Sequence, residues 1–260
     1  MAFLLRGYAI FTMLAMCVLS PTDVLSMPAQ GAHPHTGSPE AILLDATNRD
    51  RASAGLPAYQ WDESLAASSR KHAERMAQRS TLSHQFPGEA SLEDRATQSG
   101  ARFSVLAENV AEGPTVAGLE TQWMNSPPHR ANILADDMNA IGIAVVQSGN
   151  TFFAVEDFSQ AVPSIDLGMQ ESQVEQLIAS RNMKVVKETS DARQTCKMRQ
   201  GFAGKKPLVI LHYETTDLSR LPEDIDQKLR SGKYHSAAVG ACESAGEGFT
   251  QFRIAILLFP

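Results

Sequence analysis

The sequence lacks the features that most often mark an enzyme or a membrane protein. Only three of its 260 residues are cysteine. It has no Gly-rich phosphate loop, no zinc-protease pair of histidines, no nucleophile elbow and no paired-cysteine zinc ribbon. Acidic residues outnumber basic ones, 29 against 23, which disfavours a nucleic-acid partner. Any site must therefore be assembled from residues that lie far apart in the chain.

The N-terminus is typical of a cleaved export signal. Arg6 precedes an apolar run, Tyr8 to Leu19, that is shorter than the ~20 residues of a membrane-spanning helix. A small residue at Ser26 predicts cleavage there, giving a signal peptide of residues 1–26. Lipid anchoring through Cys17 is the alternative, although the preceding Met16 suits a lipidated cysteine poorly. We expect a secreted or periplasmic protein with no membrane-spanning segment in the mature chain.

The cysteines that remain after this cleavage form an even pair. Cys196 and Cys242 lie in a chain bound for an oxidising compartment, which favours one disulfide between them. Two separate buried thiols are the alternative.

Changes in composition divide the mature chain into three parts. Residues 27–39 are rich in Pro, Gly and His and predict a flexible leader. Residues 40–162 give helices first and a hairpin last, which indicates an α+β domain. Residues 163–260 open a smaller α/β module, whose last strand is apolar throughout and therefore expected at the centre of its sheet. The two modules also share a weak sequence similarity, in which residues 141–143 and 151–158 correspond to residues 239–241 and 250–258. This similarity does not by itself establish a duplication.

Periodicity places the elements within these parts. The first domain is expected to hold helices at 40–54, 62–79, 92–99 and 115–125, and strands at 140–147 and 151–159. The second module is expected to hold helices at 170–182 and 222–231, and strands at 207–213, 234–242 and 250–259. Apart from its short helix, the stretch 80–114 shows no long period and is interpreted as irregular.

Three polar segments stand next to the ends of these elements: LSHQ at 82–85, AENV at 107–110 and SPPHRANIL at 126–134. In this order, and framed by Trp61 and the closing hairpin, they resemble the CAP superfamily of cysteine-rich secretory proteins, antigen 5 and pathogenesis-related proteins. That superfamily includes bacterial SCP-like extracellular proteins. The resemblance covers roughly residues 40–162 and implies an α-β-α sandwich. It further implies a cleft lined by two histidines and two acidic residues, which binds zinc in some members.

The resemblance assigns the cleft residues one by one. The two histidines fall on His84 and His129, and the first acidic residue falls on Glu108, beside Asn109. The second acidic residue has no counterpart, because Ser126 stands at its position. Bacterial members often read Trp-Met-Asn-Ser there as well.

The remaining three residues allow two interpretations. His84, Glu108 and His129 would supply three zinc ligands and leave a fourth position for water. A hydrolase also needs a proton acceptor, for which Glu112 and Asp157 are candidates. Alternatively, Glu108 hydrogen-bonds the imidazoles and holds two loops in place. Ser126 is interpreted as a helix cap rather than a nucleophile, and Asn109 as a residue of the surrounding frame.

The function expected from these residues is that of a secreted binding module for an extracellular lipid, sterol, glycan or protein. A secreted zinc-dependent hydrolase, peptidase-like, is the first alternative. A third interpretation makes residues 163–260 the binder and the first domain a scaffold. No catalytic residue is assigned, and zinc is the one cofactor considered.

Overall fold

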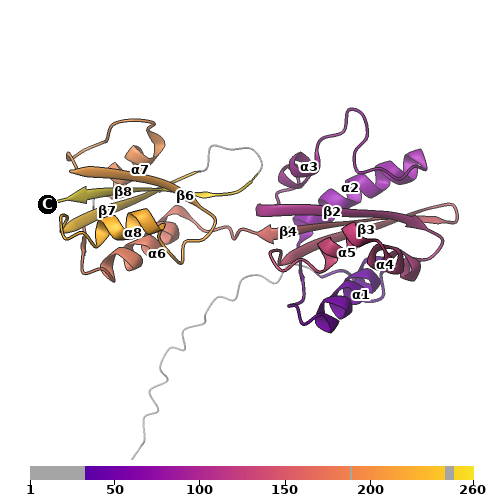
Figure 1. Ribbon diagram of the computed structural model, residues 1–260. Coiled ribbons are helices and arrows are strands. Elements are labelled where there is room, and N and C mark those ends of the chain that lie inside the picture. Colours follow the sequence, from indigo (N-terminus) through magenta and orange to yellow (C-terminus); the bar gives the residue numbers. More distant parts are fainter. Residues whose placement is uncertain (1–32, 188, 244–248) are drawn as a thin grey trace, which may run out of the picture. The chain divides into compact units, whose positions relative to one another are not determined.

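The computed structural model describes residues 33–187, 189–243 and 249–260, which form two four-stranded sheets with helices packed against them (Figure 1). The predicted fold class, α+β, is confirmed. The predicted signal peptide and residues 27–32 of the predicted leader lie outside the described residues. Over the described ranges, every helix is too short or too polar to cross a bilayer.

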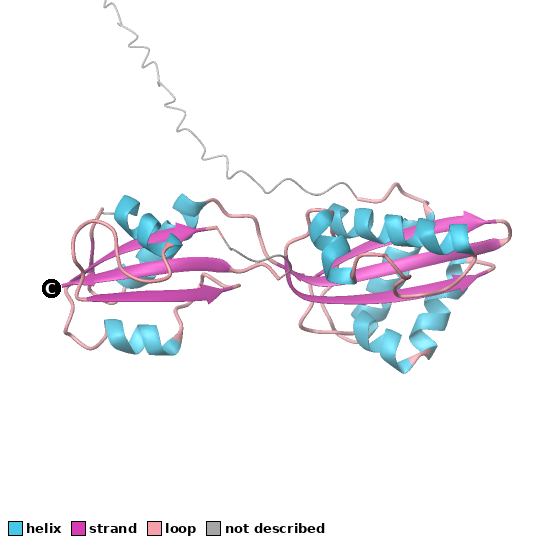
Figure 2. Cartoon of the chain, turned by 90° about the horizontal axis from the view of Figure 1, so that it is seen from above, coloured by secondary structure: helices cyan, strands magenta, loops and turns pink. Residues whose placement is uncertain are grey.

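The first sheet belongs to an α-β-α sandwich formed by residues 39–161, the N-terminal sandwich. Its strands run in the order β1-β3-β4-β2. Helices α2 and α3 lie on one side of the sheet, and α1, α4 and α5 lie on the other (Figures 1 and 2). The elements are α1 (Pro39–Ser53), β1 (Gln60–Trp61), α2 (Glu63–Arg79), α3 (Leu92–Gln98), β2 (Phe103–Gly113), α4 (Val116–Asn125), α5 (Pro127–Ile133), β3 (Ala140–Ser148) and β4 (Thr151–Ala161).

Strand β2 corrects the interpretation of residues 80–114 as irregular. It pairs antiparallel with β4 along its whole length, with Glu108 opposite Asp157 and Asn109 opposite Glu156. Polar and small residues hid this strand, because Glu, Asn, Ala and Gly all have low β propensity. Since side chains alternate between the faces of a sheet, Glu108 and Asp157 share the α2 face, and Asn109 and Glu156 share the opposite face.

Local capping explains why the helices begin where they do. The side chains of Ser38, Asp62 and Thr115 each accept a hydrogen bond from a backbone N–H in the first turn of α1, α2 and α4, which satisfies donors that a helix start leaves free. Helix α1 also has Pro39 in its first turn, where a missing N–H costs nothing. The predicted helix starts at 40, 62 and 115 are thus confirmed to within one residue.

The second sheet belongs to the C-terminal sandwich, residues 167–259, with strands in the order β5-β7-β8-β6. Its elements are α6 (Leu167–Ala179), β5 (Lys184–Val185), α7 (Thr189–Lys197), β6 (Val209–Thr215), α8 (Glu223–Leu229), β7 (Ser236–Cys242) and β8 (Phe252–Phe259). The predicted central position of the last strand is confirmed. So is the predicted disulfide, which joins Cys196 of α7 to Cys242 of β7.

The two sandwiches repeat one arrangement. In each, the first strand pairs parallel with the third, the fourth pairs antiparallel with the third and the second, and helices separate the first three strands. Each third strand also carries a glycine where a helix crosses it. A Cβ on Gly142 would lie 2.1 Å from the backbone of Ala66, and one on Gly240 would lie 2.1 Å from that of Ala192. Ala66 and Ala192 are each the fourth residue of their helix.

Candidate functional site

The candidate site is centred on the carboxylate of Glu108, which lies on β2. Oε1 of Glu108 lies 2.9 Å from Nδ1 of His84, and Oε2 accepts a hydrogen bond from the guanidinium of Arg95 on α3. The side chain of Glu108 is 4% exposed, whereas that of His84 is 61% exposed. Glu108 therefore lies below the surface, and the imidazole that it contacts is accessible to solvent.

His129 reaches the same region through its main chain. Asn109 is fully buried, and its Nδ2 donates to the carbonyl oxygen of His129 over 3.2 Å. Nδ2 of Asn132 donates to Oδ1 of Asn109 and to the carbonyl oxygen of Glu108. These contacts hold the α5 turn that bears His129 against β2. These hydrogen bonds are consistent with the interpretation of Asn109 as a residue of the surrounding frame.

The pKa values of the two histidines are shifted in opposite directions. The hydrogen bond to Glu108 raises the pKa of His84 against the opposing effect of burial. Burial lowers the pKa of His129, and the positive charge on His84 lowers it further. Because the charge of His84 affects the ring of His129, the two imidazoles lie within electrostatic reach of each other. As the pH falls, His84 takes up its proton before His129 does.

The hydrogen bonds of Glu108 decide whether His84, Glu108 and His129 could together bind zinc. Both of its oxygens already accept hydrogen bonds, and one of them from a cationic guanidinium. A carboxylate engaged in this way suits the role of orienting a histidine better than that of a direct ligand. Within the described residues, no three His, Cys, Asp or Glu side chains are grouped closely enough to hold a metal ion. The three residues as arranged do not fit a three-ligand zinc site.

The two candidates for a general base occupy different environments. Asp157 is fully buried, and burial, followed by the charge of Glu108, raises its pKa well above the usual range. This environment disfavours the ionised form of Asp157, which is the form that a general base must take. Glu112 is exposed, but it lies four residues along β2 from Glu108, about 13 Å at the rise of a strand. Neither residue is placed to serve His84 as a base.

Ser126 lies at the junction of α4 and α5, where the sequence predicts a cap. Its backbone N–H bonds to Trp123 and its carbonyl oxygen accepts from Arg130, so the main chain makes the turn. The side chain itself forms no capping hydrogen bond. The position predicted for Ser126 is confirmed, while the capping is done by the backbone.

A second pair of carboxyl groups, which the sequence did not reveal, lies on the opposite face of the sheet. Glu156 of β4 is fully buried and Glu120 of α4 is 6% exposed, and Oγ1 of Thr47 lies 2.9 Å from Oε1 of Glu156 and 3.3 Å from Oε2 of Glu120. Burial, with a further contribution from Asp50, raises the pKa of Glu120 to about 8. Burial and the charge of Glu120 also raise the pKa of Glu156 well above its usual range. Asn109 joins this pair to the site, since its Nδ2 lies 3.4 Å from Oε2 of Glu156.

This pair predicts that the N-terminal sandwich loses stability as the pH rises. A carboxyl group whose pKa is higher in the folded state than in the unfolded chain binds more protons when folded, so its contribution is fully present below the unfolded pKa of about 4.5. It is lost as the pH rises through about 8. We expect the free energy of unfolding to fall by at least about 1 kcal/mol between about pH 5 and about pH 8. Urea unfolding followed by tryptophan fluorescence measures it.

Glu120→Gln should remove the part of that pH dependence that Glu120 contributes, because the amide keeps the shape of the carboxyl group but does not ionise. The matched control is Glu112→Gln on the exposed end of β2, which should leave the dependence unchanged. A decline of equal size in both variants would contradict the assignment to the buried pair.

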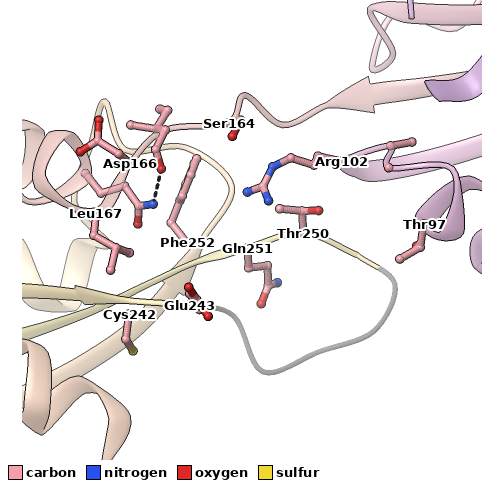
Figure 3. A pocket seen from close by; sticks show the side chains of 14 residues that line it. Thr97, Arg102, Ser164, Asp166, Leu167, Cys242, Glu243, Thr250, Gln251 and Phe252 are labelled. Carbon is pink, nitrogen blue, oxygen red and sulfur yellow. Dashed lines mark hydrogen bonds between the residues drawn. The ribbon is translucent and has the colours of Figure 1, made fainter. Parts of the chain in front are cut away.

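The cavity drawn in Figure 3 lies outside the candidate site. It has a volume of about 650 Å³, and neither histidine of the candidate site lines it. Its lining is mixed in charge, with Arg102, Asp166 and Glu243 among its side chains, and the amide of Gln170 donates to the carbonyl oxygen of Ile165 over 2.6 Å (Figure 3). The candidate site is thus defined by its hydrogen bonds and not by this cavity.

Comparison with known proteins identifies the domain that contains these residues. Residues 44–158 match the model of the cysteine-rich secretory protein family, CAP. The matched stretch contains His84, Glu108 and His129, and it runs from α1 to near the end of β4. Residues 44–158 therefore form a CAP domain, as the sequence motifs predicted.

Individual relatives each match part of the chain. The chain is 34% identical over 112 residues to the uncharacterized protein YkwD of Bacillus subtilis strain 168, which covers 43% of this chain and 44% of that protein. It is 34% identical over 110 residues to the uncharacterized membrane protein YlbC of the same organism, covering 41% and 31%. An extracellular protein with an SCP domain from Bacillus anthracis is a structural neighbour, 28% identical with a TM-score of 0.43, covering 47% of this chain and 40% of that one. The chain thus spans less than half the length of either curated relative.

Proposed function

We propose that the chain is a secreted binding module, in which His84, Glu108 and His129 organise a site for an extracellular lipid, glycan or protein. The observation that carries the proposal is the engagement of both Glu108 oxygens, one by His84 and one by Arg95. The carboxylate fixes the imidazole of His84 in one orientation, with its Nε2 edge left to contact a ligand.

The surroundings favour recognition over catalysis. The site offers one imidazole from the α2–α3 connection and one from α5, but Asp157 is buried in a setting that disfavours its charge, and Glu108 is paired with a guanidinium. Activation of water needs a free base near the reacting atoms. A site with fixed hydrogen-bonding groups and no free base suits binding.

The zinc-dependent hydrolase is the second candidate, and it is not favoured by this arrangement. It would need Glu108 to leave Arg95 and turn toward a metal between His84 and His129. Breaking one partner away from a buried ion pair is unfavourable by roughly 3–5 kcal/mol. Two imidazoles alone give zinc fewer ligands than catalytic sites provide.

One experiment separates the two functions. The purified secreted chain is assayed for zinc content after dialysis and for turnover of peptide and ester panels with added zinc, beside His84→Ala and His129→Ala. We expect no stoichiometric zinc and no turnover above that of the variants. Zinc at about one ion per chain, together with turnover that His84→Ala abolishes while the fold is retained, would replace the proposal with the hydrolase.

Binding itself is tested with stated probes. A glycan array and a fluorescent fatty acid are presented to the wild-type chain and to Glu108→Gln, which keeps the side-chain shape but weakens the bonds to His84 and Arg95. A ligand that depends on the site should bind the variant at least about tenfold more weakly. Glu112→Gln is the matched control, since it lies on the same strand outside the site. Equal affinities of the wild type and Glu108→Gln for every ligand found would contradict a role for this site.

A further inference from the structure

A buried histidine outside the candidate site holds the segment that carries His84. His72 lies on α2 and is completely buried. Its Nδ1 lies 2.8 Å from Oε1 of Glu89, and its Nε2 lies 2.7 Å from the carbonyl oxygen of Ser83. Ser83 and Glu89 bracket His84 in the connection between α2 and α3 (Figure 1). One imidazole therefore ties both ends of this connection to the helix.

The two contacts cannot both be hydrogen bonds if His72 is neutral and Glu89 is ionised. A neutral imidazole has one N–H donor, whereas both atoms that face this ring, a carboxylate oxygen and a carbonyl oxygen, are acceptors. One ring nitrogen would then turn its lone pair toward an acceptor inside a buried site, which is unfavourable. A doubly protonated ring donates to both partners. The geometry thus requires one more proton than the neutral ring carries.

The surrounding charges place that proton on the ring rather than on Glu89. The backbone N–H of Phe86 donates to Oε2 of Glu89 over 2.9 Å, and Nε of Arg75 lies 3.8 Å from Oε1. Burial raises the pKa of Glu89, but the hydrogen bonds from His72 and Phe86 and the charges of His72 and Arg95 outweigh it and leave the pKa below its usual value. Glu89 is therefore ionised, which matches a positively charged His72.

We infer that His72 and Glu89 form a proton-dependent latch that positions the His84 segment. With its extra proton the ring bonds both Glu89 and Ser83. When the ring loses that proton, one of the two bonds is lost and residues 83–89 are held less tightly. His72 and Glu89 are thus positioning residues, and the latch stands whatever ligand the candidate site binds.

The structure also supplies a variant that should remove the proton dependence without breaking the latch. In Glu89→Gln, the amide N–H₂ can donate to Nδ1 of a neutral His72, whose Nε2–H still donates to Ser83. The amide oxygen can still accept from Phe86. Every bond is then satisfied by a neutral pair. A purely structural role for Glu89 predicts no such compensation.

Two measurements test the latch. Nitrogen-15 NMR of the His72 ring should show two protonated nitrogens in the wild type under conditions in which Glu89→Gln shows one. Amide exchange of residues 80–91, corrected for its intrinsic pH dependence, should lose at least about tenfold of its protection in the wild type as the ring deprotonates. It should stay within about twofold over the same range in Glu89→Gln.

Glu74→Gln is the matched control, because Glu74 is exposed on the same helix and its variant should behave as the wild type does. Peptides from β3 and β4 serve as the reference within each sample. A wild-type His72 ring that is singly protonated in every condition in which Glu89→Gln is would overturn the inference. So would a loss of protection that is equal in the wild type and in Glu89→Gln.

Discussion

Replacing Gly142 with alanine is expected to lower the free energy of unfolding of the N-terminal sandwich by about 3 kcal/mol. The new Cβ would lie 2.1 Å from the backbone N of Ala66 and 2.3 Å from the backbone C of Leu65. Backbone atoms cannot rotate away as a side chain does, so the whole of α2 must move off the sheet. That helix carries the core residues Leu65 and Met76, and a shift would open gaps around both.

The measurement is urea unfolding followed by tryptophan fluorescence. Both tryptophans of the chain, Trp61 and Trp123, lie in the N-terminal sandwich, so the signal reports on this part. Gly149→Ala is the control, because Gly149 has a positive φ of 59° but no atom within 4 Å of a new Cβ. It should cost about 1 kcal/mol through backbone strain alone. Equal losses in the two variants would show that helix packing does not depend on Gly142.

The close contact between Gly142 and α2 also explains why the two sandwiches share an arrangement of strands and helices although their sequences are only weakly similar. Gly142 lies opposite Asp157, which lies opposite Glu108, and Gly240 lies opposite Ala255, which lies opposite His212. The glycine that admits the helix is present in both sandwiches. The acidic pair of the candidate site is present only in the first, since Ala255 and His212 stand at its positions in the second. The scaffold is repeated, and the site residues are not.

Most of the fold was accessible from sequence because its signals are local. Caps at Ser38, Asp62 and Thr115 mark helix starts, and the apolar run of β8 marks a central strand. The sequence did not predict strand β2 at 103–113, and this error also has a local cause. Strand β2 is built from residues that suit its neighbours in the site rather than a typical strand, so neither alternation nor β propensity marks it.

The candidate site was predictable only in part, for a different reason. Family resemblance brought His84, Glu108 and His129 together, and the structure places them in one region. The family resemblance could not identify their hydrogen-bond partners, because these partners lie on elements that are distant in the sequence. His72 and Glu89 are 17 residues apart, and Thr47 and Glu156 are 109 apart. No spacing rule links such residues, so the latch and the buried carboxyl pair required coordinates.

The disulfide of the C-terminal sandwich should have a still larger effect than Gly142. Cys196 and Cys242 are separated by 46 residues, and closing a loop of that length stabilises the folded state by about 4 kcal/mol in the chain-entropy model. The bond joins α7 to β7 at the end of the contact that Gly240 permits, and both cysteines are buried against Ala255. It therefore fixes the helix that covers one face of this sheet.

Replacing both cysteines with alanine is accordingly expected to lower the free energy of unfolding of the C-terminal sandwich by about 4 kcal/mol, while leaving the N-terminal sandwich unchanged. Amide exchange of β7 and β8 peptides measures the first, and tryptophan fluorescence measures the second. A reducing agent should destabilise the wild type in the same way and leave the double variant unaffected, which separates loss of the bond from loss of side-chain packing. If oxidised and reduced wild type exchange β7 and β8 amides at equal rates, the cross-link contributes nothing, and packing of α7 against Gly240 alone must hold the sandwich together.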